Sequence, residues 1–213
     1  MIPNISLIAQ SAIKIINNEG KIIYFDPFKL NGTCEHDADI IFITHSHFDH
    51  FSPEDIEEIR KESTRIVAPQ DIKSDIKKLG FLEENVLIVI PNEKYEIDGV
   101  RFETIPAYNT NKDFHKKEYN WVGYIATIDD KRIYIAGDTD NIEEARNIIC
   151  DIAMVPVGGT YTMTAEEAAD LIKNIKPKLA IPIHYKTIVG SIEDAETFKK
   201  LLENQVEVEI LMR

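Results

Sequence analysis

Three histidines and an aspartate lie within six consecutive positions of the stretch THSHFDH, residues 44–50. Imidazole nitrogens and carboxylate oxygens are the ligands that zinc and neighbouring divalent metals take, and a catalytic metal keeps at least one position open for water. His45 and His47 are two residues apart, so at the end of an extended strand their side chains can point to one side and reach one ion. Asp49 and His50 follow where the chain turns, and they could serve a second ion. The cluster therefore predicts a metal site.

Two more potential ligands follow apolar runs later in the chain. Asp138 comes after RIYIAG, where Gly137 lets the backbone bend sharply, and His184 comes after LAIPI. Polar residues at the ends of buried runs are typical of active sites in α/β folds, which collect such groups at the strand ends. Taken with the cluster, the two residues complete a ligand set.

The elements that must position these residues are strands and helices in alternation. Residues 11–27 are typical of a hairpin around the turn NNEG, and the apolar run at residues 39–44 is the strand expected before the histidine cluster. A helix is expected over residues 52–62, because Ser52 can cap it and Pro53 suits its first turn. Asp55 can form the reciprocal hydrogen bond to the backbone of the capping residue. The other expected elements are strands at 65–69, 86–90, 152–157, 179–183 and 206–212, hairpins at 95–105 and 121–139, and helices at 70–79, 143–149, after Thr164 and at 192–203. This order predicts a layered α/β architecture in one domain over residues 1–213.

Composition argues against several classes of protein. With 213 residues and 44% hydrophobic residues the chain can bury a core, but it has no apolar run of the length that a membrane span needs. Its start lacks the basic and long apolar regions of a secretory signal, so we expect a cytoplasmic protein with no membrane partner. A formal net charge of -13 opposes binding to nucleic acid. Cys34 and Cys150 are too few for a disulfide framework and are expected to be inert.

With these motifs in order, the chain resembles the metallo-β-lactamase-fold metal-dependent hydrolases. The resemblance covers nearly the whole length, from Asp26 at the end of an early strand through THSHFDH and AGDTD to IPIHY. The stretches WVGY, AGDT, PVGGTYTM and IPIHY are most similar to the small stand-alone branch that includes the ascorbate-6-phosphate lactonase-like proteins. The resemblance implies an α/β fold of the four-layer αββα sandwich type, with the metals at one edge of the two sheets.

The resemblance also implies a role for each residue of the motifs. One metal would lie near His45 and His47. A second would lie near Asp49, His50 and His184, while Asp138 bridges the two ions and Asp26 supports the ligand loop from behind. The cofactor is then one or two divalent ions, zinc first, with manganese, iron or nickel as alternatives. Asp49 and Asp138 are the expected catalytic carboxylates.

The chain departs from the family pattern at one position. The first metal of the family has a third histidine, and the matching residue here is Asn109, a weak neutral donor, so this ligand is weakened or lost. His115 lies six residues further along the same loop and could substitute, although an exposed loop histidine is the simpler interpretation.

Several other residues are candidates for substrate binding. The long loop at residues 107–120 carries Lys112, His115, Lys116 and Lys117, which could capture a phosphate or carboxylate or merely form a solvated face. Gly158 and Gly159 precede the helix capped by Thr164, so their N–H groups could hold an anion, or the turn could simply need glycine. Tyr185 could polarise a carbonyl or merely pack.

The predicted function is hydrolysis of a small anionic ester, lactone or phosphodiester by a metal-activated water. Two alternatives remain open. The first is a nuclease acting on RNA or DNA, which would share the metal site but needs a basic track that this chain lacks. The second is a metal-poor binding protein, which Asn109 suggests because it stands in the place of a histidine ligand. Assembly into a homo-oligomer is left open.

Overall fold

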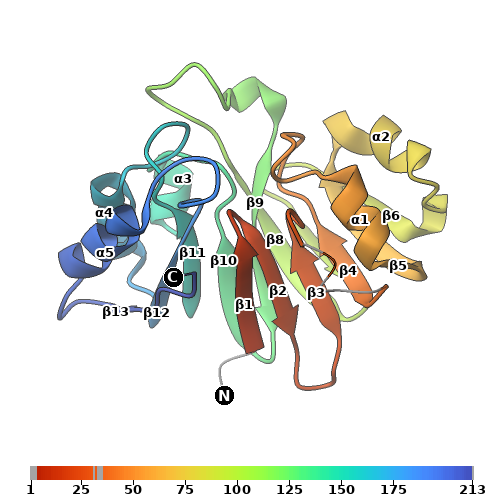
Figure 1. The fold of residues 1–213 in the computed structure, drawn as a ribbon, viewed down its shortest axis with the longest axis horizontal. Coiled ribbons are helices and arrows are strands. Elements are labelled where there is room, and N and C mark those ends of the chain that lie inside the picture. Colours follow the sequence, from red (N-terminus) through yellow and green to blue (C-terminus); the bar gives the residue numbers. More distant parts are fainter. Residues whose placement is uncertain (1–3, 31, 33–35, 213) are drawn as a thin grey trace. The chain divides into compact units, whose positions relative to one another are not determined.

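Two sheets are present in the computed structural model, which describes residues 4–30, 32 and 36–212 (Figure 1). Each sheet belongs to one of two compact units, Met1–Ile90 and Pro91–Arg213, which are described in turn. The mixed α/β fold class is confirmed. The extension of one domain over residues 1–213 stays a prediction.

The first unit contains a six-stranded sheet with the strands in sequence order, β1 to β6. Its strands are β1 (Asn4–Ala9), β2 (Ala12–Ile16), β3 (Ile22–Phe25), β4 (Ala38–Phe42), β5 (Arg60–Pro69) and β6 (Val86–Val89). The first three strands pair antiparallel, whereas β3 to β6 pair parallel. Phe25 pairs with Phe42, so β3 and β4 end together and place the residues that follow them at one edge of the sheet.

Short helices connect the parallel strands of this unit. They are α1 (Pro53–Ile59), η1 (Gln70–Ile72), α2 (Lys73–Lys78) and η2 (Glu83–Asn85). Ser52 caps α1 as expected, and Ile56, Ile59 and Ile76 lie fully buried in a core with Ile41 and Ile66 from the strands.

The second unit contains a seven-stranded sheet in the order β13-β12-β11-β10-β9-β8-β7. Its strands are β7 (Lys94–Ile97), β8 (Val100–Pro106), β9 (Val122–Ile128), β10 (Lys131–Ile135), β11 (Ile152–Pro156), β12 (Leu179–Ile183) and β13 (Glu207–Val208). The strands β7 to β10 are antiparallel neighbours and β10 to β13 are parallel. The chain therefore leaves β10, β11 and β12 at the same edge, because parallel strands share one direction.

The helices of the second unit are η3 (Lys117–Tyr119), α3 (Glu143–Arg146), α4 (Ala165–Ile175) and α5 (Ile192–Leu201). The predicted capping of α4 is confirmed, since Thr164 and Glu167 form a reciprocal capping box. Figure 1 shows α3, α4 and α5 grouped beside β11, β12 and β13. Among the described residues no helix is both long and apolar enough to cross a membrane.

Some predicted boundaries were wrong. Strand β1 was not predicted, and α1 ends at Ile59 rather than at residue 62. Arg60 is already extended and pairs with Ala38, so the pairing of β5 with β4 takes the last residues of the expected helix into the sheet. The helix expected at residues 143–149 is only Glu143–Arg146, and β13 is two residues long.

Candidate metal centre

The histidine cluster of the first unit lies directly after β4. The Nε2 atom of His45 is 3.1 Å from Nδ1 of His47, and the rings of His45 and His50 are 4.0 Å apart between centroids. Asp49 Oδ2 is 3.6 Å from His50 Nε2. A tight turn brings these residues together, since the N–H groups of His50 and Phe51 both donate to the carbonyl of His47. His45, Asp49 and His50 are buried, so their donor atoms are held in place rather than spread over the surface.

Asp26 fixes the orientation of this cluster from the neighbouring strand. Its carboxylate accepts hydrogen bonds from the Thr44 N–H at 2.8 Å, from the Thr44 hydroxyl at 2.7 Å and from His50 Nδ1 at 2.7 Å. The backbone of Asp26 is left-handed at φ 47°, an uncommon conformation that turns the side chain toward Thr44. Burial raises the pKa of Asp26 above its ordinary value, while His50 and Thr44 act in the opposite direction.

These bonds set which nitrogen of each ring carries the proton. The Thr44 hydroxyl gives its proton to Asp26, so at 3.0 Å from His45 Nδ1 its oxygen acts as acceptor. His45 and His50 therefore carry protons on Nδ1, and in the neutral rings Nε2 holds the lone pair that a metal needs. The sequence predicted a supporting role for Asp26 but did not identify Thr44, although it stands inside the THSHFDH motif.

Two buried histidines of the second unit contact the same carboxylate oxygen of a buried aspartate. The Nε2 atoms of His115 and of His184 both lie 3.2 Å from Asp138 Oδ2. The three side chains are between 1% and 3% exposed. Asp138 follows β10 after Gly137 at φ 65°, and His184 follows β12 with its own backbone at φ 57°. Two imidazoles on one buried carboxylate oxygen are a donor arrangement that suits divalent metals.

The expected exposed position of His115 is wrong, because this residue is 1% exposed and faces Asp138. Asn109, the residue that stands where the family pattern has histidine, is in contact with it. Its Oδ1 atom is 2.7 Å from His115 Nδ1, and its Nδ2 donates to the Tyr161 carbonyl at 2.8 Å. The metal-ligand role of either residue stays a prediction.

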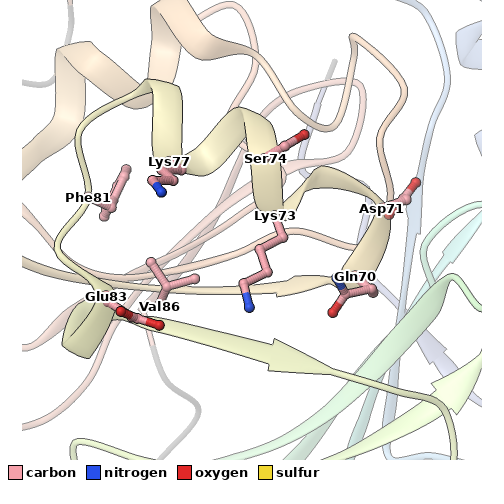
Figure 2. Close-up of a pocket in the computed structure, with 8 residues that line it drawn as sticks. All are labelled: Gln70, Asp71, Lys73, Ser74, Lys77, Phe81, Glu83 and Val86. Atoms are coloured by element: carbon pink, nitrogen blue, oxygen red, sulfur yellow. The ribbon is translucent and has the colours of Figure 1, made fainter.

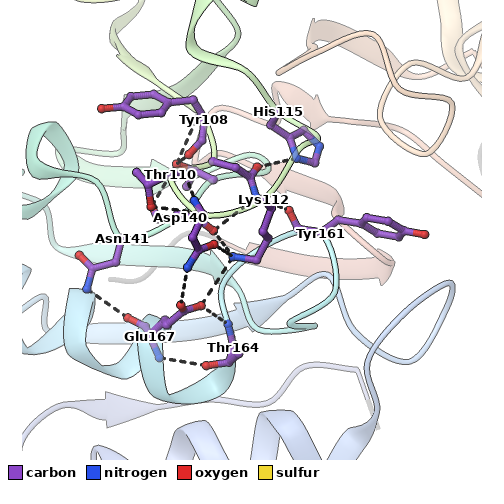
Figure 3. A network of polar contacts seen from close by, with 12 residues as sticks. Tyr108, Thr110, Lys112, His115, Asp140, Asn141, Tyr161, Thr164 and Glu167 are labelled. Atoms are coloured by element: carbon purple, nitrogen blue, oxygen red, sulfur yellow. Dashed lines mark hydrogen bonds and ion pairs between the residues drawn. The ribbon is translucent and has the colours of Figure 1, made fainter.

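Asp140 organises the loop that carries these residues, a role that the sequence did not reveal although AGDTD was noted as a motif. Its buried carboxylate accepts from the N–H of Thr110 at 2.7 Å and from Lys112 Nζ at 2.5 Å (Figure 3). Its own N–H donates to the Tyr108 carbonyl. Asp140 thus ties three parts of the loop to the end of β10, two through its carboxylate and one through its backbone N–H.

The predicted substrate lysines differ in their surroundings. Lys112 is 15% exposed and pairs with Asp140. Lys117 is exposed and pairs with Glu144 at 2.8 Å, which raises the pKa of Lys117. Lys116 is exposed. The charges of Lys112 and Lys117 are therefore already balanced by carboxylates.

The glycine pair has a structural reason. A Cβ on Gly158 would lie 2.3 Å from the carbonyl oxygen of His184, and Gly159 has φ 75°. The turn therefore needs glycine so that the chain after β11 can approach His184 closely. Tyr185 is fully buried and its hydroxyl donates to the Met212 carbonyl at 2.7 Å, which favours packing over contact with substrate.

The first unit also has a hollow of about 630 Å³ beside α2 (Figure 2). Its lining residues are Gln70, Asp71, Lys73, Ser74, Lys77, Phe81, Glu83 and Val86. None of these eight residues is a histidine or a cysteine, and the charged residues among them are Asp71, Lys73, Lys77 and Glu83.

Comparison with known proteins agrees with the fold. Residues 4–184 match the family model described as β-lactamase superfamily domain, so the chain belongs to this family. The chain is 31% identical to a candidate metal-dependent hydrolase of solved structure from Parabacteroides distasonis, with a TM-score of 0.83 over 98% of this chain and 93% of that one. The metallo-β-lactamase fold predicted from the sequence is confirmed.

Two relatives show which branch of the superfamily the chain is similar to. The UPF0173 metal-dependent hydrolase of Thermococcus onnurineus is 32% identical over 97% of this chain and 95% of its own length. The UPF0173 metal-dependent hydrolase of Thermococcus kodakarensis is 36% identical over 90% of this chain and 89% of its own length. The chain is thus a member of a family of metal-dependent hydrolases. The narrower resemblance to the lactonase-like branch stays a prediction.

Proposed function

We propose that this chain hydrolyses a small ester, lactone or phosphodiester with a water molecule activated by one or two divalent metal ions. Zinc is the proposed ion, with manganese, iron and nickel as alternatives, because the donor atoms are imidazole nitrogen and carboxylate oxygen. Family membership supports the proposal, since the matched residues 4–184 include both ligand sets.

Each unit of the chain contributes its own set of proposed ligands. They are His45, His47, Asp49, His50, His115, Asp138 and His184. The observation that carries the proposal lies within the second unit, where His115 and His184 each place Nε2 at 3.2 Å from Asp138 Oδ2. Asp138, which the family resemblance implies as a ligand, would hold a metal ion together with these two histidines.

When bound, such a metal lowers the pKa of a water molecule toward neutrality and stabilises the charge that develops on a substrate oxygen. The chain's own residues prepare the site for this chemistry. Asp26 accepts a hydrogen bond from Nδ1 of His50, and Thr44 accepts one from Nδ1 of His45. Nε2 of each ring therefore has a lone pair for a metal ion, and no proton has to move first. Asp49 keeps 8% exposure, and its carboxyl group is the proposed carrier of a proton to the leaving group.

The proposal does not depend on capture of an anionic substrate. Lys112 pairs with Asp140 and Lys117 pairs with Glu144, whereas Lys116 is exposed. The net charge of -13 also argues against the nuclease alternative.

The test is a panel of esters, lactones and phosphodiesters assayed with zinc-loaded protein, chelator-treated protein and two variants. Asp138→Asn should lose bound metal and all hydrolysis. Asp151→Asn is the matched control, because Asp151 lies on the same unit but accepts hydrogen bonds from the N–H of Arg132 and from Lys178, away from the ligand set. Failure of zinc-loaded wild-type protein to hydrolyse any member of the panel, or full activity in chelator, would contradict the proposal and favour a binding protein.

A further inference from the structure

Asn109 and His115 contact each other at the two ends of a seven-residue stretch. The N–H of Asn109 donates to the carbonyl of His115 at 2.7 Å, and His115 Nδ1 lies 2.7 Å from Asn109 Oδ1. The main chain and the side chain of Asn109 therefore both hold His115. This two-point contact keeps the imidazole buried at 1% exposure, although most of the residues around it in the loop are exposed.

The orientation of the Asn109 amide follows from its other partners. The nitrogen Nδ2 donates to the carbonyl oxygen of Tyr161 at 2.8 Å and lies 3.4 Å from a carboxylate oxygen of Asp140. Both partners are acceptors, so the amide nitrogen must face them. The atom that faces His115 is consequently the amide oxygen, which can only accept a hydrogen bond.

An acceptor at this place determines where the imidazole of His115 carries its proton. Nδ1 must donate to Asn109 Oδ1, so in the neutral ring the lone pair is on Nε2. Nε2 is the atom that lies 3.2 Å from Asp138 Oδ2. The opposite neutral tautomer would let Nε2 donate to Asp138 at 3.2 Å, but it would set two acceptors against each other in the shorter contact with Asn109 at 2.7 Å and would put a proton on the nitrogen that faces the ligand set.

We infer that Asn109 is a positioning residue that holds His115 in the Nδ1–H tautomer and aims Nε2 at the metal ligands, so that His115 supplies the imidazole donor that Asn109 itself does not provide. The inference rests on the proposed function for the identity of the ion, but the tautomer and the contact are properties of the chain. Outer partners of this kind typically contribute about 10-fold to 100-fold to metal affinity.

The variants should separate the hydrogen bond from the rest of the side chain. Asn109→Ala removes the acceptor and should weaken zinc binding about 10-fold to 100-fold, measured by competition with a chromophoric chelator. Asn109→Asp keeps an oxygen facing Nδ1 but sets its second oxygen against the Tyr161 carbonyl and the Asp140 carboxylate, so it should restore only part of the affinity. Asn111 is a neighbouring asparagine on the exposed part of the loop, so Asn111→Ala is the matched control. This variant should bind zinc like the wild type.

A double-mutant cycle tests whether Asn109 acts through His115. In the His115→Ala background the further change Asn109→Ala should have little additional effect on zinc affinity, because the residue that it positions is gone. If Asn109→Ala weakens zinc binding equally in both backgrounds, Asn109 acts as a direct ligand or as a general support, and the inference is overturned.

A spectroscopic measurement on the wild type covers the case in which a variant does not fold. Long-range ¹H–¹⁵N correlation spectra, recorded on metal-free and zinc-loaded protein about two pH units above the ordinary imidazole pKa of about 6.5, report the tautomer of each histidine. The signal missing from His115→Gln identifies His115, and it should show Nδ1 protonated in both samples. An Nε2–H tautomer overturns the inference. Absence of zinc binding in every protein, wild type included, overturns the proposed function instead.

Discussion

Replacing Asp26 by asparagine should alter both the stability of the first unit and its histidine cluster. The wild-type carboxylate accepts three hydrogen bonds, one on Oδ1 from the Thr44 N–H and two on Oδ2 from the Thr44 hydroxyl and His50 Nδ1. Asparagine offers one oxygen and one NH₂ group in the same space. The backbone N–H of Thr44 can only donate, so the amide oxygen must take the place of Oδ1 and the NH₂ group that of Oδ2.

The consequences at the Oδ2 position differ for its two partners. The Thr44 hydroxyl can rotate and accept from the new NH₂ group. His50 can do so only by moving its proton from Nδ1 to Nε2, which removes the lone pair from the proposed ligand atom. Loss of one hydrogen bond to a buried charged group costs about 1.5–3 kcal/mol. The burial that raises the pKa of Asp26 also means that removing the charge recovers part of this loss, so we expect a net destabilisation of about 1–2 kcal/mol.

The assay is thermal and denaturant unfolding of chelator-treated protein, with zinc affinity measured separately. For a chain of this length the expected fall in Tm is about 2–8 °C. Asp39→Asn is the matched control, because Asp39 lies in β4 of the same sheet but pairs with Lys61 at 2.7 Å near the surface. An exposed pair of that kind is worth about 0–1 kcal/mol. If Asp26→Asn is no less stable than Asp39→Asn and binds zinc like the wild type, the reasoning about Asp26 is refuted.

Two further outcomes follow from burial and charge. Lys112→Ala should lower the stability of the protein by about 2 kcal/mol because it leaves the buried carboxylate of Asp140 without its counter-charge, whereas Lys116→Ala should change stability by less than about 0.5 kcal/mol. Equal effects in denaturant unfolding would contradict this assignment. Burial raises the pKa of the Cys150 thiol to about 12, so in the folded protein at about pH 8 its alkylation by iodoacetamide, followed by peptide mass spectrometry, should be at least about 100-fold slower than in denaturant. Similar rates in the two conditions would show that Cys150 is an ordinary exposed thiol. Cys34 lies outside the described residues.

The amino-acid sequence was sufficient to predict most strands, the helix caps and the family. Spacing alone placed Asp26, the histidine cluster, Asp138 and His184 at the ends of apolar runs, and in the structure each follows a strand of its sheet. Such features are local, because they depend on turn residues, caps and periodicity within a few positions of the chain. Boundaries were less predictable, as at Arg60, where pairing with a strand distant in sequence overrides a local helix signal.

The tertiary structure decided which side chains accompany these ligands. In the sequence His115 is one histidine in a polar loop, and its identity as a buried neighbour of Asp138 depends on the contacts of Asn109 and Asp140. The need for glycine at Gly158 depends likewise on the carbonyl of His184, which is far along the chain. These are contacts between residues that are remote in sequence, and one sequence contains no periodic signal for them. The chain's pattern of residue types therefore predicted the class of chemistry, whereas folding determined which loop residues could take part in it.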